Sequence, residues 1–358
     1  MDDTYYMRKA LRLAEKGTGH VSPNPRVGAV IVENDHILST GYHAAYGKVH
    51  AEVDAISKLP KEALEGSCIY VNLEPCSHYG KTPPCVNAII ESGISRVVVG
   101  MQDPNPLVSG NGIRKLIDCG IEVKQHVLEE DCIRINQGFI KFIQTKQPFV
   151  TIKIAQTLDG FIATENGLSK WITSEKARSH VQKIRHESDA ILVGVQTIVA
   201  DDPSLTIRNK KHSGLKRFIL DSTLRIPEHA KLLSHPDPEN TYIVTTEKAD
   251  QKAVEKLEAK GVHIWKIGRR EISLLDLMKR MGEIGVASLL VEGGAQVFTS
   301  FIKENLADRV MIFYAPKLFG TGIPSFLDLG VRQPDKAFRF KQCSWKKIGD
   351  EMMFEGQF

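Results

Sequence analysis

Three side chains in the first half of the sequence could hold a metal ion: His50, Cys76 and Cys85. A catalytic zinc ion typically takes three protein ligands and leaves a fourth position for water. We therefore predict that these three residues bind zinc. A purely structural zinc site would need a fourth protein ligand. The alternative candidate for that ligand is His78, within the segment 74-EPCSHYGKTPPC-85.

An acidic residue stands next to the predicted zinc ligands. Glu52 lies two residues beyond His50, so chain connectivity keeps its carboxylate near the metal. Zinc lowers the pKa of a bound water to about 7, and a nearby carboxylate can carry that proton to a ring nitrogen and then to a leaving amine. This is the chemistry of hydrolytic deamination, in which H-x-E followed by P-C and a second cysteine recurs. We predict that Glu52 is the catalytic proton shuttle.

Two predicted helices would position these groups. Cys85 follows Pro83 and Pro84 and precedes an apolar-periodic segment, which places it at a helix N-terminus. His50 lies at the start of the preceding predicted helix. The helix dipole and the metal both favour a thiolate at such a position. We expect two helix N-termini to converge on one cation, with the charge of the cysteines offsetting the unfavourable sign of the helix dipoles.

The rest of the first half alternates strands with helices, which predicts an α/β layered domain with a largely parallel sheet. Helices are predicted at 2–16, 51–59, 86–93, 112–119 and 129–144. Strands are predicted at 27–32 and 37–43, as a hairpin, and at 67–73, 96–101 and 121–127.

The polar segment 145-TKQP-148 is the predicted domain boundary, so we expect domains at 1–145 and 148–358. The alternation then restarts as a second α/β unit. Strands are predicted at 149–155, 190–194, 217–221, 241–246, 262–265, 286–292 and 309–315, with an antiparallel pair within 338–358. Helices are predicted at 174–186, 249–260, 273–284 and 295–304.

Composition narrows the class of protein. The 358 residues carry a net charge of +4 and 7% aromatic residues, which suits small phosphorylated anions better than nucleic acid. No apolar run approaches the roughly 20 residues of a membrane span, and the N-terminus does not read as a secretory signal. Six cysteines are too few for a disulfide scaffold. We therefore expect a cytoplasmic enzyme with no membrane partner.

Four motifs give the first half a family resemblance: 22-SPNPRVGAVIV-32, 50-HAE-52, 74-EPCSHYGKTPPC-85 and 101-MQDPNP-106. Together they resemble the deaminase half of the bifunctional riboflavin-biosynthesis deaminase/reductases. In the wider cytidine-deaminase-like group the cysteines are usually C-x-x-C, whereas eight residues separate them here. The resemblance implies that Asn24 hydrogen-bonds the pyrimidine and that His78 and Lys81 lie near the ribose phosphate.

The second half contains 289-LLVEGGAQVF-298, a strand, two glycines and a helix, which could present backbone N–H groups to a phosphate. With 153-KIAQTLDGFIA-163, 169-SKWITS-174, 194-GVQTIVADDPSLTIR-208 and 220-LDST-223 it resembles the reductase half of the same family. That resemblance implies NADPH as cofactor. The implied cofactor-binding residues are Ala155, Trp171, Thr197, Asp201, Ser222, Gly294, Ala295 and Gln296. The implied substrate-binding residues are Lys153, Ser169, Arg185, Leu205, Arg208 and Glu292.

The resemblance implies a three-layer cytidine-deaminase-like domain followed by a dihydrofolate-reductase-like domain, and a protein that self-associates. Its implied activity is zinc-dependent deamination of a diamino-ribosylaminopyrimidine 5′-phosphate, then NADPH-dependent reduction of the ribosyl side chain. Lys153 interrupts an apolar strand and could polarise the sugar oxygen or donate a proton. The alternatives are a nucleoside or tRNA deaminase with an unrelated nucleotide-binding appendage, and a zinc-stabilised binding module.

Overall fold

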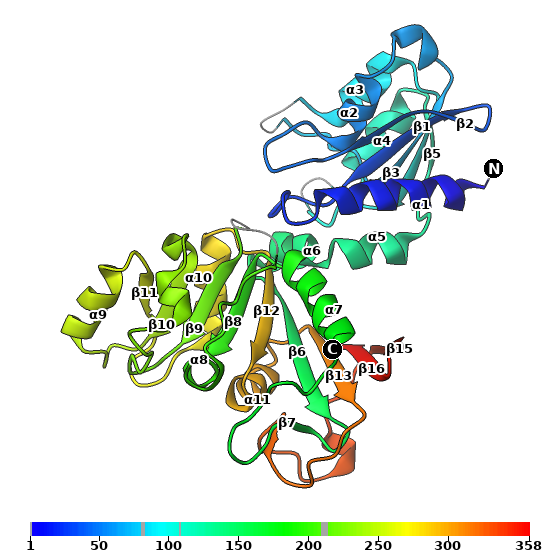
Figure 1. Cartoon of the computed structure of the whole chain (residues 1–358). Helices are drawn as coiled ribbons and strands as arrows, with labels where there is room; N and C mark the ends of the chain where they lie inside the picture. The colour runs from blue at the N-terminus through cyan, green and yellow to red at the C-terminus, as the bar shows by residue number, and fades with distance from the viewer. Residues whose placement is uncertain (1, 80–82, 107–108, 209–213) are drawn as a thin grey trace. The chain divides into compact units, whose positions relative to one another are not determined.

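The computed structural model divides the chain into two compact units, Met1–Lys146 and Gln147–Phe358 (Figure 1). It describes four stretches: 2–79, 83–106, 109–208 and 214–358. Within these stretches, no helix is both long enough and apolar enough to cross a lipid bilayer.

The first unit is built on a five-stranded sheet in the order β2-β1-β3-β4-β5. Its strands are β1 (Gly28–Glu33), β2 (His36–Tyr42), β3 (Cys68–Leu73), β4 (Arg96–Met101) and β5 (Glu122–Lys124). β1 runs antiparallel to β2 and β3, whereas β3, β4 and β5 are parallel. The predicted hairpin is confirmed as β1 and β2. The prediction of a largely parallel sheet is wrong for this unit, because β1 also pairs antiparallel with β3.

Helices cover both faces of this sheet and make three layers. They are α1 (Asp3–Ala14), α2 (Ala51–Ile56), α3 (Cys85–Ser92), α4 (Asn111–Asp118), α5 (Glu129–Ile135) and α6 (Gln137–Thr145). α1 and α5 lie on one face, and α2, α3 and α4 lie on the other (Figure 1).

The single helix predicted at 129–144 is instead two helices, α5 and α6, which meet at Asn136. The Asn136 side chain accepts a hydrogen bond from the backbone N–H of Arg26 at 2.8 Å and donates one to the Arg26 carbonyl at 3.1 Å. An asparagine side chain that bonds backbone groups competes with helix continuation. This break was not visible in the apolar pattern because the hydrophobic periodicity runs through it.

Close packing against β2 places the start of α2. A Cβ atom added at Gly41 would lie 2.2 Å from the carbonyl oxygen of Ala51 and 2.5 Å from the backbone nitrogen of Ala55. Only glycine allows backbones to approach this closely. The helix therefore rests directly on the strand, and His50, its N-cap residue, is held by the sheet.

The second unit contains a nine-stranded sheet in the order β11-β10-β9-β8-β12-β6-β13-β16-β15. Its strands are β6 (Phe149–Thr157), β8 (Ala190–Gly194), β9 (Lys216–Leu220), β10 (Thr241–Thr245), β11 (His263–Lys266), β12 (Ser288–Gly293), β13 (Arg309–Ala315), β15 (Gln342–Ile348) and β16 (Glu351–Gln357). The strands from β11 to β13 are parallel, and β16 and β15 extend the sheet antiparallel. The predicted antiparallel pair at the C-terminus is confirmed. The sequence did not predict the small pair β7 (Phe161–Ala163) and β14 (Ile323–Pro324).

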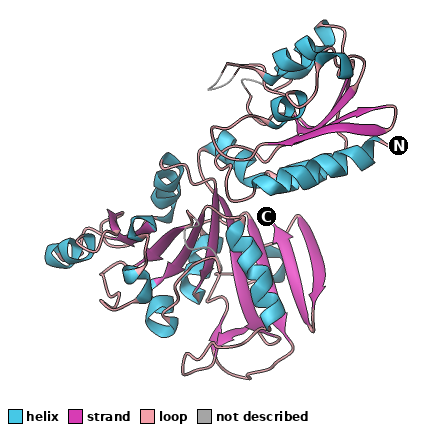
Figure 2. Cartoon of the chain, turned by 45° about the horizontal axis from the view of Figure 1, so that its top comes forward, coloured by secondary structure: helices cyan, strands magenta, loops and turns pink. Residues whose placement is uncertain are grey.

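Helices cover both faces of the large sheet (Figure 2). They are α7 (Glu175–His186), α8 (Val195–Asp201), α9 (Gln251–Glu258), α10 (Leu274–Glu283) and α11 (Ala295–Lys303), of which α8 was not predicted. Side chains alternate between the faces of a strand. On β12, Leu289 and Val291 pack in the core beneath α10 and α11, whereas Leu290 packs in the cluster that contains Ile184 of α7.

Candidate functional site

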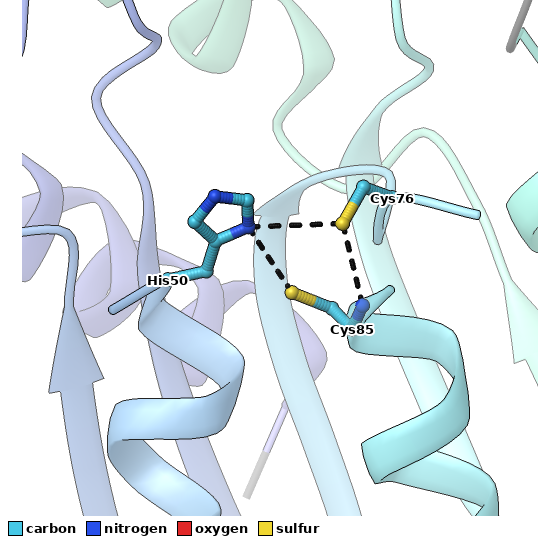
Figure 3. Close-up of side chains that lie close together, drawn as sticks. All are labelled: His50, Cys76 and Cys85. Carbon is cyan, nitrogen blue, oxygen red and sulfur yellow. Dashed lines mark hydrogen bonds between the residues drawn. The ribbon is translucent and has the colours of Figure 1, made fainter. Parts of the chain in front are cut away.

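The three predicted zinc ligands come together in the first unit. Nδ1 of His50 lies 3.2 Å from Sγ of Cys85 and 3.7 Å from Sγ of Cys76 (Figure 3). All candidate ligand atoms lie within 4.8 Å of one another. Tetrahedral zinc with ordinary Zn–N and Zn–S bonds would hold such atoms roughly 3.5–3.8 Å apart. The donor set and its spacing therefore fit zinc.

Each ligand is placed by a different structural element. His50 is the N-cap of α2, Cys85 is the first residue of α3, and Cys76 follows the end of β3. Among the residues that the structure describes, these three form a group that could hold a metal ion. His78, the alternative fourth ligand, is exposed and outside the group. Three ligands are the pattern of a catalytic rather than a structural zinc site.

Cys76 and Cys85 interact closely, and the interaction acts on the acidity of Cys76. The hydrogen bond with Cys85 lowers the pKa of Cys76 well below its ordinary value, against burial and with help from His50. The backbone N–H of Cys85 also donates to Sγ of Cys76 at 3.3 Å. A thiolate stabilised in this way is a ready ligand for a soft divalent cation.

Glu52 is buried beside this cluster. Its exposed fraction is 4%, and burial raises the pKa of its carboxyl to about 7, with a further contribution from the charge of Cys76. A carboxyl group with a pKa near neutrality can both accept and release a proton at physiological pH. The location and the acidity of Glu52 are compatible with the predicted role of a proton shuttle.

Asn24 contacts a histidine that sequence reasoning missed. Nδ2 of Asn24 lies 3.2 Å from Nε2 of His43, and Nδ1 of His43 lies 3.0 Å from the carbonyl oxygen of Val49. This pairing requires an Nδ1–H tautomer, because the Asn24 amide donates to Nε2. Burial lowers the pKa of His43, which favours the neutral form of the ring. The His43 ring also packs edge-on against His50, with centroids 5.5 Å apart.

A second missed residue is Glu74, the first of the E-P-C motif. Its buried carboxylate accepts hydrogen bonds of 2.9–3.3 Å from four backbone N–H groups, those of Asp103, Gly110, Gly112 and Ile113. The segment after β4 is therefore fastened to the strand end that carries Cys76. No sequence signal separates this role from an ordinary exposed glutamate. The predicted substrate residue Lys81 lies outside the described residues.

The second unit contains a cavity of about 1120 Å³ beside the carboxyl-terminal halves of β6, β8, β9 and β12. Open α/β sheets bind ligands at this end of their strands. Every residue predicted for the cofactor or the substrate in this unit lines it: Lys153, Ala155, Ser169, Trp171, Arg185, Thr197, Asp201, Leu205, Arg208, Ser222, Glu292, Gly294, Ala295 and Gln296. The volume exceeds that of a typical drug-sized site, so a dinucleotide and a second ligand could share it.

We call this cavity the nucleotide pocket. A buried network of ion pairs lies within it. Arg185 donates to Glu292 through Nε at 2.6 Å and Nη2 at 3.0 Å, and Nζ of Lys153 lies 3.2 Å from Oε2 of Glu292. Burial alone would raise the pKa of Glu292, but the charges of Arg185 and Lys153 lower it to about 2. The Nε and Nη2 groups of Arg185 are thus engaged by Glu292. The side chain of Arg208, the other arginine predicted to contact the substrate, is exposed.

Gly293 and Gly294, at the junction of β12 and α11, are the residues that would allow a phosphate to approach the backbone. Gly294 is the N-cap of α11, a nine-residue helix. A Cβ atom added at Gly293 would lie 3.0 Å from Oγ1 of Thr197. The missing side chains leave backbone N–H groups at the helix N-terminus open to the pocket, as phosphate binding requires. This feature, with the size of the cavity, fits a dinucleotide cofactor.

The remaining predicted pocket residues are also placed by specific contacts. Trp171 is 59% exposed and stacks beneath the guanidinium of Arg178 at 4.3 Å, so it is not a core residue. Ser169 donates to Asp201 at 2.8 Å, and Nζ of Lys170 donates to the Asp201 carbonyl oxygen at 2.8 Å. These contacts fix one wall of the pocket.

Comparisons with known proteins agree with this geometry. Residues 1–101 match the model of the cytidine and deoxycytidylate deaminase zinc-binding region, and residues 148–354 match that of the RibD C-terminal domain. The riboflavin biosynthesis protein RibD of Aquifex aeolicus is 44% identical over 354 residues, which cover 98% of this chain and 97% of that protein.

Two solved structures are similar over the whole chain. RibD from Acinetobacter baumannii (form 1) has a TM-score of 0.87 at 34% identity. A diaminohydroxyphosphoribosylaminopyrimidine deaminase/5-amino-6-(5-phosphoribosylamino)uracil reductase from Thermotoga maritima has a TM-score of 0.85 at 38% identity. Each match covers 99% of this chain and 98% of the other. The predicted cytidine-deaminase-like and dihydrofolate-reductase-like folds are confirmed.

Proposed function

The chain belongs to the RibD family of riboflavin biosynthesis proteins, and we propose that its two units catalyse successive reactions. We assign to residues 1–146 the hydrolytic deamination of 2,5-diamino-6-ribosylamino-4(3H)-pyrimidinone 5′-phosphate. We assign to residues 147–358 the NADPH-dependent reduction of the ribosyl side chain to a ribityl chain. One observation carries the proposal: a three-ligand zinc set with a buried carboxyl shares a chain with a dinucleotide-sized pocket.

In the deaminase unit, His50, Cys76 and Cys85 would hold zinc, which when bound supplies an activated water. Glu52 takes one proton from the attacking water at its carboxylate and delivers it to the ring nitrogen next to the reacting carbon. Once the C–O bond has formed, Glu52 takes the second proton from the new hydroxyl and passes it to the amine, which leaves as ammonia while the carbonyl forms. Asn24, held by His43, binds the edge of the pyrimidine. Burial of Glu52 supports this role because it holds the carboxyl near neutral pKa.

In the reductase unit, bound NADPH would supply the hydride for reduction of the open-chain sugar aldehyde. The backbone N–H groups at the start of α11 would bind its pyrophosphate. Lys153 protonates or polarises the sugar oxygen, and Glu292 keeps Lys153 and Arg185 in fixed positions. Arg208, whose side chain is exposed, binds the sugar phosphate.

We further infer a cytoplasmic location and self-association of the chain. All six cysteines are free, and Cys119 and Cys343 are exposed, which suits a reducing compartment. Family membership favours this enzyme over a nucleoside or tRNA deaminase with an unrelated appendage.

The proposed function is tested by adding the diaminopyrimidine phosphate to the purified protein and measuring ammonia, then NADPH oxidation. Ammonia release followed by stoichiometric NADPH consumption is expected. Deamination of cytidine or of tRNA, with none of the diaminopyrimidine, would contradict the assignment.

A further inference from the structure

The nucleotide pocket reaches a turn after β9 where only Ser222 was predicted to contact a ligand. Arg225 and Lys231 also line the pocket at this end. Neither residue was singled out in the sequence. Their positive charges stand apart from the ion network of Lys153, Arg185 and Glu292, so they need an explanation of their own.

The turn that carries Ser222 and Arg225 is fixed by hydrogen bonds. Asp221 accepts the backbone N–H of Ile226 on Oδ2 at 2.8 Å, and its own N–H donates to the Val244 carbonyl at 2.8 Å. Thr246 donates through Oγ1 to the Ser222 carbonyl at 2.9 Å. Because both ends of the turn are anchored to the sheet, Ser222 and Arg225 are presented to the pocket in a defined arrangement.

The guanidinium group of Arg225 has N–H donors that no described residue uses in a hydrogen bond. Its Nε lies 4.0 Å from Oδ1 of Asp221, its side chain is 63% exposed, and within the described part of the chain it makes no hydrogen bond. Asp221 is fully buried, and its Oδ1 accepts no hydrogen bond from any described residue. Asp221 therefore attracts Arg225 electrostatically, and the N–H groups of the Arg225 guanidinium remain able to bind an anion. The positive charge of Lys231 is more fully neutralised than that of Arg225, because Nζ of Lys231 lies 3.4 Å from Oδ2 of Asp202.

The order of the strands indicates which anion Arg225 would bind. β12 and β8 separate β6, which carries Lys153, from β9, so the two ends of the pocket are roughly 14 Å apart at the usual strand spacing. A dinucleotide with its reactive ring near Lys153 and its pyrophosphate at α11 extends its adenosine half towards the end of β9. The phosphate that NADPH carries and NADH lacks is attached to the ribose of that half.

We propose that Arg225, assisted by Ser222, binds the 2′-phosphate of NADPH and makes the second unit prefer NADPH over NADH. This inference rests on the proposed reductase function and names the residue that selects its cofactor. A bidentate arginine–phosphate contact is strong and geometrically specific, whereas a hydroxyl in the same place would gain little from it.

The test measures binding rather than turnover. Purified full-length wild type and Arg225→Gln are titrated with NADPH and NADH by nicotinamide fluorescence, and with 2′,5′-ADP and 5′-AMP as competitors. The matched control is Arg332→Gln, because Arg332 also pairs with an aspartate four residues earlier, is 71% exposed and does not line the pocket. Thermal unfolding confirms that each variant is folded.

We expect Arg225→Gln to weaken NADPH and 2′,5′-ADP binding about 10- to 100-fold, as loss of a charged hydrogen bond predicts, with NADH and 5′-AMP unchanged. Arg225→Lys should recover part of the loss, and Arg332→Gln should bind like wild type. Equal weakening of NADPH and NADH, or no change in either, would overturn the role of Arg225 while leaving the reductase assignment intact. Failure of the wild type to bind either nucleotide would overturn both.

Discussion

Arg185 and Glu292 form a bidentate ion pair inside the nucleotide pocket, with contacts of 2.6 Å from Nε and 3.0 Å from Nη2. Both residues were expected to contact the substrate. In the structure they contact each other, and Lys153 joins the same carboxylate. Two cations around one buried anion leave a net positive charge where a phosphorylated sugar would bind.

The first prediction concerns acid stability. Burial opposes ionisation of Glu292, but Arg185 and Lys153 lower its pKa to about 2 from an ordinary value of 4.5. A depressed folded-state pKa contributes stability that is complete above about pH 4.5 and is lost as the pH falls towards 2. Glu292→Gln should remove this dependence and lower the unfolding free energy of the second unit at pH 7 by about 3–5 kcal/mol, because two buried cations lose their counter-ion.

Urea unfolding followed by tryptophan fluorescence measures this effect in one unit alone. All three tryptophans, Trp171, Trp265 and Trp345, belong to the second unit. Glu283→Gln, on the exposed face of α10, is the control and should unfold like wild type. Wild-type stability and an unaltered acid profile in Glu292→Gln would show that the network is not stabilising.

Lys153 is predicted to act in the reduction and not in the deamination. Lys153→Ala should slow NADPH oxidation on the deaminated intermediate by about 10²–10⁴-fold, the usual contribution of a general acid. Ammonia release should be unchanged, because the residue belongs to the second unit. NADPH binding, measured by fluorescence, serves as the control for an intact pocket. Unchanged NADPH oxidation would end this assignment.

The zinc ligands are tested by metal content. Cys76→Ser should lose bound zinc and ammonia release together, because the remaining histidine and cysteine cannot hold the ion tightly. A strong chelator should have the same effect on the wild type, with NADPH oxidation preserved. Cys119→Ser removes an exposed cysteine outside the cluster and should keep one zinc per chain. Full zinc occupancy in Cys76→Ser would refute the ligand set.

Much of the fold could be predicted because hydrophobic periodicity is local. Strands such as β4 and β13 begin and end where the apolar runs do. The first sheet is mixed because β1 pairs antiparallel with β3, a strand well separated from it in the sequence, and local periodicity does not encode that pairing. The break at Asn136 depends on a contact with Arg26, 110 residues away in sequence, so the local pattern could not reveal it.

The residues of the candidate site also separate into those that the sequence could identify and those that depend on contacts in the folded chain. His50, Cys76 and Cys85 were identifiable because metal chemistry restricts residue type and spacing. His43 and Glu74 were missed because their roles come from contacts with Asn24 and with four backbone N–H groups. Neither contact follows from residue type, since a histidine at a strand end and a glutamate before a proline have many ordinary uses.

The central claim is that a buried carboxyl beside a three-ligand zinc set performs the deamination. The most direct test measures ammonia release from the diaminopyrimidine phosphate by Glu52→Gln, together with its zinc content. The account predicts one zinc per chain, normal NADPH oxidation on the deaminated intermediate, and ammonia release reduced by at least about 10²-fold. Ammonia release at the wild-type rate from the zinc-loaded variant would contradict it.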